Sequence, residues 1–153
     1  MAGSQFVYVT YIRTTPEKLW KALIEPEFTR QYWCNTTQES EWKPGTTWRI
    51  VTPDGRTADS GEIIAIEPQQ RMVLTWRHEL DDDLRAEGYS RLTYDLEQNG
   101  EAVKFTVTHT MDKSDSEFIQ AIATGWPPIL SSLKSLLETG QSLKATRCWP
   151  DEM

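Results

Sequence analysis

Residues 114–140 read SDSEFIQAIATGWPPILSSLKSLLETG, the longest helical pattern in the chain. Ser114-Asp115-Ser116-Glu117 fits a capping box, which predicts the start of a helix. A helix with a continuous apolar stripe needs a large apolar partner surface. Here the stripe recurs every three or four positions and consists of Phe118, Ile122, Trp126, Ile129, Leu133 and Leu136 or Leu137.

The sequence also predicts an interruption in this helix, its end and a tail after it. Pro127-Pro128 falls within the stripe and predicts a kink or break near Gly125, where the missing side chain would also allow close approach to a sheet. Gly140 predicts the end of the helix. Residues 141–153 have little periodicity, so we expect a mobile C-terminal tail with Cys148-Trp149 as its only feature.

The partner surface is predicted from residues 88–109. Asn99-Gly100 is the strongest hairpin turn signal in the sequence, and a two-residue turn there fixes the register of both strands. The opposite face of this hairpin is polar or charged, as a half-buried antiparallel sheet requires. The inward face carries four facing pairs: Leu96 and Val103, Tyr94 and Phe105, Leu92 and Val107, Ser90 and His109.

The rest of the sheet is predicted from the N-terminal half. Residues 34–44 and 79–87 are polar or acidic and predict loops. A turn at residues 68–70 sets Glu67 opposite Arg71, so that Glu62 would face Trp76 and point inward; a slipped register would expose it instead. Runs of β-branched and aromatic residues predict strands at residues 6–12, 46–52, 61–67 and 71–78.

Two short helices follow the first strand. Thr15-Pro16-Glu17 supplies an N-cap, a first-turn proline and an acidic residue that complements the helix dipole. Pro26 ends this helix and begins a second one that runs to Tyr32. The sequence therefore predicts a single α+β domain over residues 5–140, in which a curved antiparallel sheet of about six strands wraps around the long C-terminal helix.

Composition excludes several classes of function. Twenty-three acidic and sixteen basic residues give a net charge of −7, which disfavours nucleic acid and anionic lipid surfaces. The sequence contains no run long enough to cross a bilayer and no secretory signal, so we expect a cytoplasmic protein without membrane insertion. Cys34 and Cys148 show no metal-ligand spacing, and reduced thiols are expected.

Several short motifs, in order and with sensible gaps over residues 5–140, resemble the family of activators of the heat-shock-protein-90 ATPase, within the START-like or polyketide-cyclase-like superfamily. Each motif is weak alone, and their succession is fairly specific. They are Thr15 to Leu23 (TPEKLWKAL), Pro26-Glu27, Gly45 with Trp48, Gly61 to Ile64 (GEII), Pro68 to Arg71 followed by Leu74-Thr75-Trp76, Gly125-Trp126, Ile129-Leu130 and Leu137 to Gly140 (LETG).

The resemblance implies a helix-grip fold with a cavity between the concave sheet and the long helix, where relatives hold lipids, polyketides or other apolar molecules. It implies no reaction. We therefore expect an apolar or aromatic small-molecule ligand and no cofactor. Two alternatives are a co-chaperone module of the stress response, which stimulates a heat-shock-protein-90 ATPase, and a cyclase or hydrolase. The sequence leaves monomer and homodimer open, and also the ligand and the pathway.

Candidate chemistry is sparse. His78 and His109 are predicted at one end of the concave face, with their backbones two strand spacings, or roughly 10 Å, apart. The two rings would be too far apart for direct contact but close enough to flank a ligand. No phosphate loop, nucleophile elbow, triad or metal-ligand spacing is visible, so no catalytic or metal-binding residue is assigned and a non-enzymatic role is favoured. A strand-end histidine is more often a partly exposed polar residue than a catalytic one.

Large rigid rings can line a cavity, although tryptophans also serve as core packing. Trp20 is expected in the core, and the choice stays open for Trp33, Trp48, Trp76 and Trp126. The polar residues Glu62, His78, Ser90 and His109 are the candidates for orienting a polar end of the ligand. The full set of candidate ligand-binding residues is Trp33, Trp48, Ile50, Glu62, Ile64, Leu74, Trp76, His78, Ser90, Leu92, Tyr94, Phe105, Val107, His109, Ile122, Trp126 and Ile129.

Overall fold

The computed structural model describes residues 3–149. The chain forms one sheet and four α-helices within these residues, followed by a short 3-10 helix. The elements are β1 (Ser4–Ile12), α1 (Pro16–Ile24), α2 (Pro26–Tyr32), β2 (Thr37–Ser40), β3 (Thr47–Val51), β4 (Thr57–Glu67), β5 (Arg71–His78), α3 (Asp82–Ala86), β6 (Ser90–Asn99), β7 (Ala102–Met111), α4 (Glu117–Thr139) and the 3-10 helix (Lys144–Thr146).

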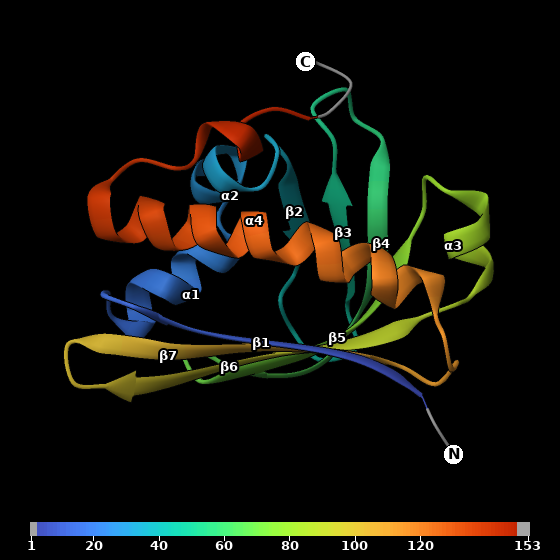
Figure 1. The fold of residues 1–153 in the computed structure, drawn as a ribbon, viewed down its shortest axis with the longest axis horizontal. Coiled ribbons are helices and arrows are strands. Elements are labelled where there is room, and N and C mark those ends of the chain that lie inside the picture. Colours follow the sequence, from blue (N-terminus) through green and yellow to red (C-terminus); the bar gives the residue numbers. More distant parts are fainter. Residues whose placement is uncertain (1–2, 150–153) are drawn as a thin grey trace.

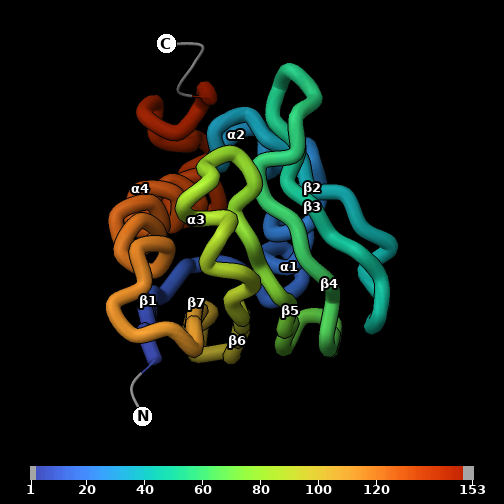
Figure 2. The backbone as a smooth tube through the Cα atoms, turned by 90° about the vertical axis from the view of Figure 1, so that its right-hand side faces the viewer, coloured from blue at the N-terminus to red at the C-terminus, as the bar shows by residue number. Residues whose placement is uncertain are grey.

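The seven described strands form one antiparallel sheet in the order β1-β7-β6-β5-β4-β3-β2. The sheet curves strongly: β1, β7 and β6 lie beneath α4, while β4 and β3 stand up along one side (Figure 1). Seen end-on, the sheet forms a trough that contains α1 and α2 next to β2 and β3, with α4 above β1 and β7 (Figure 2). This arrangement is the helix-grip fold that the sequence predicts.

The strand count and two loops differ from the sequence prediction. The predicted loop at residues 34–44 contains β2, whose four residues pair with β3 and add a seventh strand. The predicted acidic loop at residues 79–87 contains α3, because the Asp81 side chain caps it by accepting from the backbone N–H groups of Asp83 and Leu84. Both elements are too short to show a clear period in the sequence.

The β6–β7 hairpin turns one residue later than predicted. Its turn residues are Gly100 and Glu101, Asn99 pairs with Ala102, and Gly100 has a φ of 62°. A glycine at the first central position suits such a turn, and Asn99 extends the strand instead. Every cross-strand partner is therefore displaced by two residues. A shift of two preserves the faces, so Leu92, Tyr94, Phe105 and Val107 are all buried as predicted.

The β4–β5 pairing contains a bulge that the sequence did not show. Glu67 pairs with Arg71 as predicted, but beyond Ala65 the register shifts and Ile63 pairs with Leu74. Glu62 and Ile64 are consequently exposed: for Glu62 the slipped register given as the alternative is the one observed, and the inward position of Ile64 is wrong. Gly61 allows this close approach, because a Cβ there would lie 1.8 Å from the Thr75 carbonyl oxygen.

Helix α4 begins later than predicted and runs without interruption. Its N-cap is Ser116, not Ser114; the Ser116 hydroxyl accepts from the Ile119 N–H at 3.1 Å. The acidic partner of the cap comes from outside the helix, since the Glu87 carboxylate accepts from the Ser116 hydroxyl at 2.5 Å and from the Glu117 N–H at 2.9 Å.

The predicted break at Pro127-Pro128 does not occur. Both prolines lie inside the continuous helix, between the buried Trp126 and Leu130, so packing on both sides of the pair maintains the helix. Gly125 is exposed, and a Cβ added to it would have no neighbouring atom within 4 Å, so it does not approach the sheet as predicted. Gly140 ends the helix in the left-handed conformation, as predicted.

The apolar faces of the sheet and α4 meet in one core. Leu92, Phe105, Val107 and Leu133 are fully buried and belong to the same cluster as Trp126. No helix among residues 3–149 has the length and apolar character that a membrane span requires. Both cysteines are free thiols.

The segment after α4 is hydrogen-bonded to the domain as far as the structure describes it. The Leu143 N–H donates to the Ser132 hydroxyl at 2.9 Å, and the Thr146 carbonyl accepts from the Cys34 N–H at 2.7 Å. The last part of the predicted tail, residues 150–153, lies outside the described residues.

Candidate functional site

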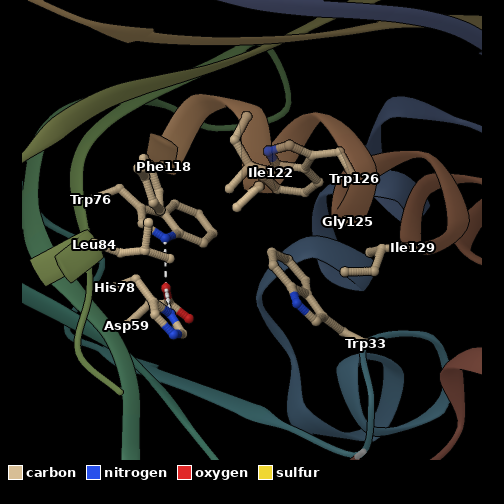
Figure 3. Close-up of a pocket in the computed structure, with 11 residues that line it drawn as sticks. Trp33, Asp59, Trp76, His78, Leu84, Phe118, Ile122, Gly125, Trp126 and Ile129 are labelled. Carbon is tan, nitrogen blue, oxygen red and sulfur yellow. Dashed lines mark hydrogen bonds and ion pairs between the residues drawn. The ribbon is translucent and has the colours of Figure 1, made fainter. Parts of the chain in front are cut away.

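A pocket of about 240 Å³ lies between the first half of α4 and the side of the trough formed by β4, β5, α3 and the end of α2. Figure 3 shows its lining residues around a common open space. They are Trp33, Asp59, Trp76, His78, Leu84, Phe118, Ala121, Ile122, Gly125, Trp126 and Ile129.

Three tryptophans form the main wall of the pocket. Trp33 is the C-cap of α2, Trp76 comes from β5, and Trp126 belongs to the apolar stripe of α4. The ring centroids of Trp33 and Trp76 are 5.9 Å apart, those of Trp33 and Trp126 are 5.2 Å apart, and those of Trp76 and Trp126 are 5.6 Å apart. Each ring therefore packs against the other two, in stacked or edge-to-face geometry that aromatic pairs prefer.

The polar edge of the pocket is a carboxylate–imidazole pair. Asp59 and His78 are cross-strand partners on β4 and β5, and the His78 Nδ1 lies 3.0 Å from the Asp59 Oδ1. The same oxygen accepts from the Trp76 Nε1–H at 2.9 Å. The His78 and Asp59 side chains are only 25% and 14% exposed, respectively. The hydrogen bond to Asp59 raises the pKa of His78 above its usual value.

This geometry leaves two polar atoms available. Because Nδ1 donates to Asp59, the His78 Nε2 remains, and no residue in the described part of the chain bonds to it. The Asp59 Oδ2 likewise accepts no hydrogen bond from residues 3–149. In Figure 3 the second carboxylate oxygen lies on the side of the pair that faces the open middle of the pocket.

His109 belongs to a separate buried network. Trp126 Nε1–H donates to His109 Nδ1 at 3.3 Å, so the ring proton is on Nε2 and is directed to the Ser90 hydroxyl at 2.7 Å. Ser90 in turn donates to the Trp76 carbonyl at 2.9 Å. Burial lowers the pKa of His109 to about 3. The ring is therefore neutral, fully hydrogen-bonded and part of the core rather than of the pocket.

The candidate residues divide into three groups. Trp33, Trp76, His78, Ile122, Trp126 and Ile129 line the pocket. Glu62 and Ile64 lie on the exposed face of the sheet and do not reach it. The others are buried in the core outside the pocket lining: Trp48, Ile50, Leu74, Ser90, Leu92, Tyr94, Phe105, Val107 and His109.

Sequence reasoning missed several lining residues. Asp59 was missed because the predicted strand began at Gly61 and the β4 bulge, which sets Asp59 opposite His78, has no local signature. Leu84 lies in the segment that the sequence predicts as a loop. Phe118 and Gly125 were identified in the helical pattern, but only as stripe and kink residues. No cluster of residues suited to hold a metal ion occurs within residues 3–149.

The fold and this pocket together define a helix-grip protein with a small, aromatic-lined site under its long helix. The family model described as "Activator of Hsp90 ATPase homolog 1-like protein" matches residues 13–138. The chain belongs to this family, and the resemblance given by its sequence motifs is confirmed. No functionally curated protein matches the sequence.

Solved structures share the fold at low sequence identity. Protein MLL2253 from Mesorhizobium loti is 22% identical with a TM-score of 0.74, covering 88% of this chain and 96% of that one. The Aha1 dimer from Colwellia psychrerythraea is 18% identical with a TM-score of 0.73, covering 91% and 99%. CalU16 from Micromonospora echinospora is 14% identical with a TM-score of 0.71, covering 90% and 78%.

Proposed function

We propose that this protein binds a small aromatic or apolar molecule in the pocket between α4 and the β4–β5 side of the sheet. The observation that carries the proposal is the pocket itself: its walls are almost entirely aromatic or aliphatic, and one polar pair stands at its edge. Small-molecule sites typically combine an apolar lining with a few fixed polar groups. Membership of a family with the helix-grip fold supports this location.

The pocket volume limits the ligand. About 240 Å³ lies below the usual range of roughly 300–1,000 Å³ for pockets that hold drug-sized ligands. A molecule of one or two fused rings therefore suits it better than a full-length lipid. Binding would be stabilised by about 25 cal/mol for each Å² of apolar surface removed from water.

A steric variant tests this proposal. Gly125 lines the pocket, and a Cβ built there meets no atom within 4 Å, so Gly125→Leu adds bulk at the pocket lining and its Cβ fits the fold. Ala123→Leu is the matched control, because Ala123 is exposed on the same helix and does not line the pocket. We expect 1-naphthylmethanol, measured by isothermal titration calorimetry, to bind the wild type and Ala123→Leu equally and Gly125→Leu at least about tenfold more weakly. Equal affinity of all three proteins would contradict the proposal.

Acid–base catalysis at the same edge is a second candidate, favoured by one observation. Asp59 holds the Nδ1 side of His78, and Nε2 carries no partner within the described residues. An imidazole oriented in this way can accept a proton from a bound substrate through Nε2 and return it. If a turnover reaction is found, His78→Gln should reduce kcat with little change in KM; an unchanged kcat would exclude this role.

A further inference from the structure

The pocket lining contains an acidic side chain but no lysine or arginine. Among the eleven residues that line it, Asp59 is the one carboxylate, and the set contains no lysine or arginine. The first basic residue on each side of His78 in the sequence is already paired: Arg77 and Arg85 bind the Glu79 carboxylate at 2.8 Å and 3.1 Å. The whole chain carries a net charge of −7. When His78 is neutral, the electrostatic potential of the pocket therefore favours a cation over an anion.

The Asp59 carboxylate has room for a further donor. Its Oδ1 accepts from both Trp76 Nε1 and His78 Nδ1, whereas its Oδ2 has no hydrogen-bond donor among residues 3–149. Asp59 lines the pocket and its side chain is only 14% exposed, so bulk water has limited access to the remaining hydrogen-bonding capacity. A ligand N–H group placed there would satisfy it.

The walls reinforce the same preference. Indole rings attract a cation that lies within about 6 Å of the ring centroid, and tryptophan is the strongest of the aromatic residues in this respect. The centroids of Trp33, Trp76 and Trp126 lie 5.2–5.9 Å from one another, and all three rings line the pocket, so the pocket offers a cation several indole rings close together. Combined aromatic walls and one carboxylate are the chemistry that recognises organic ammonium ions.

On this basis, and resting on the proposed ligand-binding function, we propose that the pocket selects an aromatic or apolar amine whose ammonium group contacts Asp59 and the tryptophan rings. The apolar body of the amine would occupy the space beneath Ile122 and Ile129. The amine need not be a substrate, since binding alone accounts for the arrangement.

The site should couple this binding to the protonation of His78. Protonation of His78 at Nε2 gives the ring a positive charge, which partly neutralises Asp59 and repels a ligand ammonium at the same carboxylate. The other charged groups around His78 are Glu79 and Asp81, which favour its charged form, with Glu79 neutralised by Arg77 and Arg85. Ammonium binding should therefore release a proton from His78, and affinity should rise as the pH increases through the pKa of His78.

Three probes with one aromatic body test the selectivity. 1-Naphthylmethylammonium, 1-naphthylmethanol and 1-naphthylacetate differ in the charge of the head group, and an aliphatic ammonium stays charged at about pH 8. By isothermal titration calorimetry at that pH, we expect the ammonium to bind at least about tenfold more tightly than the alcohol, and the carboxylate to bind most weakly. Asp59→Asn should abolish the preference for the ammonium over the alcohol.

The outcomes separate the two proposals. If the alcohol binds as tightly as the ammonium, or the carboxylate binds most tightly, the amine proposal fails and the ligand-binding function stands. If none of the three binds, both fail.

A thermal unfolding curve verifies that Asp59→Asn is folded. If this variant is unfolded, the pH dependence of ammonium binding to the wild type and to His78→Gln provides the test. Ammonium affinity should rise from about pH 6 to about pH 8 in the wild type and stay flat in His78→Gln, and a flat wild-type response contradicts the coupling.

Discussion

At the scale of single residues, the two histidines lie in opposite environments. His78 is partly exposed at the pocket edge and is held by Asp59, whereas His109 is buried among Ser90, Trp126 and Phe118. The sequence places both on the concave side of the sheet but contains no local sign of their different partners. Those partners depend on the β4 bulge and on side-chain packing from α4.

The His78–Asp59 hydrogen bond predicts a pKa that responds to mutation. The chain has only two histidines, so proton NMR can follow each imidazole separately during a pH titration. We expect the pKa of His78 to lie above about 6.5 in the wild type and to fall in Asp59→Asn, because the carboxylate that favours the charged form is removed. An unchanged pKa in Asp59→Asn would show that Asp59 does not hold the ring.

The lowered pKa of His109 predicts that the protein loses stability as the pH falls. Its folded pKa of about 3 lies below the unfolded value of about 6.5, so the unfolded state gains a proton first as the pH falls. Its contribution is complete above about pH 6.5 and is lost toward pH 3. Between about pH 7 and pH 5, the free energy of unfolding from urea titration should fall by roughly 2 kcal/mol more in the wild type than in His109→Gln. Parallel pH profiles for the two proteins would refute this.

At the scale of elements, the sequence predicts the long helix, the two short helices and the central strands, because each has a clear period or cap. It does not predict what depends on contacts distant in sequence. Glu87 caps α4 from 30 residues away in place of the local capping box, and the bulge near Ile64 reverses the faces of Glu62 and Ile64. Of the candidate residues, those on α4 line the pocket, those on β5 do so except Leu74, and those on β4 do not.

Gly61 and Gly125 provide a matched test of the close approach between β4 and β5. At Gly61 a Cβ would lie 1.8 Å from the Thr75 carbonyl oxygen, so Gly61→Ala must displace the β4–β5 backbone. We expect it to destabilise the fold by about 2 kcal/mol or more. Gly125→Ala has open space and a helical backbone, and should stabilise by up to about 1 kcal/mol. Urea unfolding of both variants measures this; a neutral Gly61→Ala would contradict the observed strand approach.

The continuous path of α4 through its proline pair predicts a stabilising substitution. Pro128 is exposed and lacks the N–H that a helix interior normally uses. Pro128→Ala should raise the free energy of unfolding by about 1–3 kcal/mol, since alanine restores that donor and suits the helix. Ser131→Ala, at another exposed position of α4, should change it by only a few tenths. Destabilisation by Pro128→Ala would mean that the proline is required for the path of α4.

At the scale of the whole molecule, the curved sheet and α4 bury a common apolar core, and a pocket opens beneath the first half of α4. There the tryptophans of three separate elements meet around the open pocket (Figure 3). The sequence predicts the trough from amphipathic patterns alone. It cannot predict how far side chains fill the trough, which explains why nine candidate residues proved to be core rather than pocket.

The indole N–H signals of the seven tryptophans test the central claim most directly. In a titration of ¹⁵N-labelled protein with 1-naphthylmethylammonium, the signals of Trp33, Trp76 and Trp126 should shift together and saturate. Those of Trp20 and Trp42, which do not line the pocket, should stay in place. Shifts confined to Trp20 and Trp42, or no saturable shift at Trp33, Trp76 and Trp126, would contradict a ligand site beneath α4.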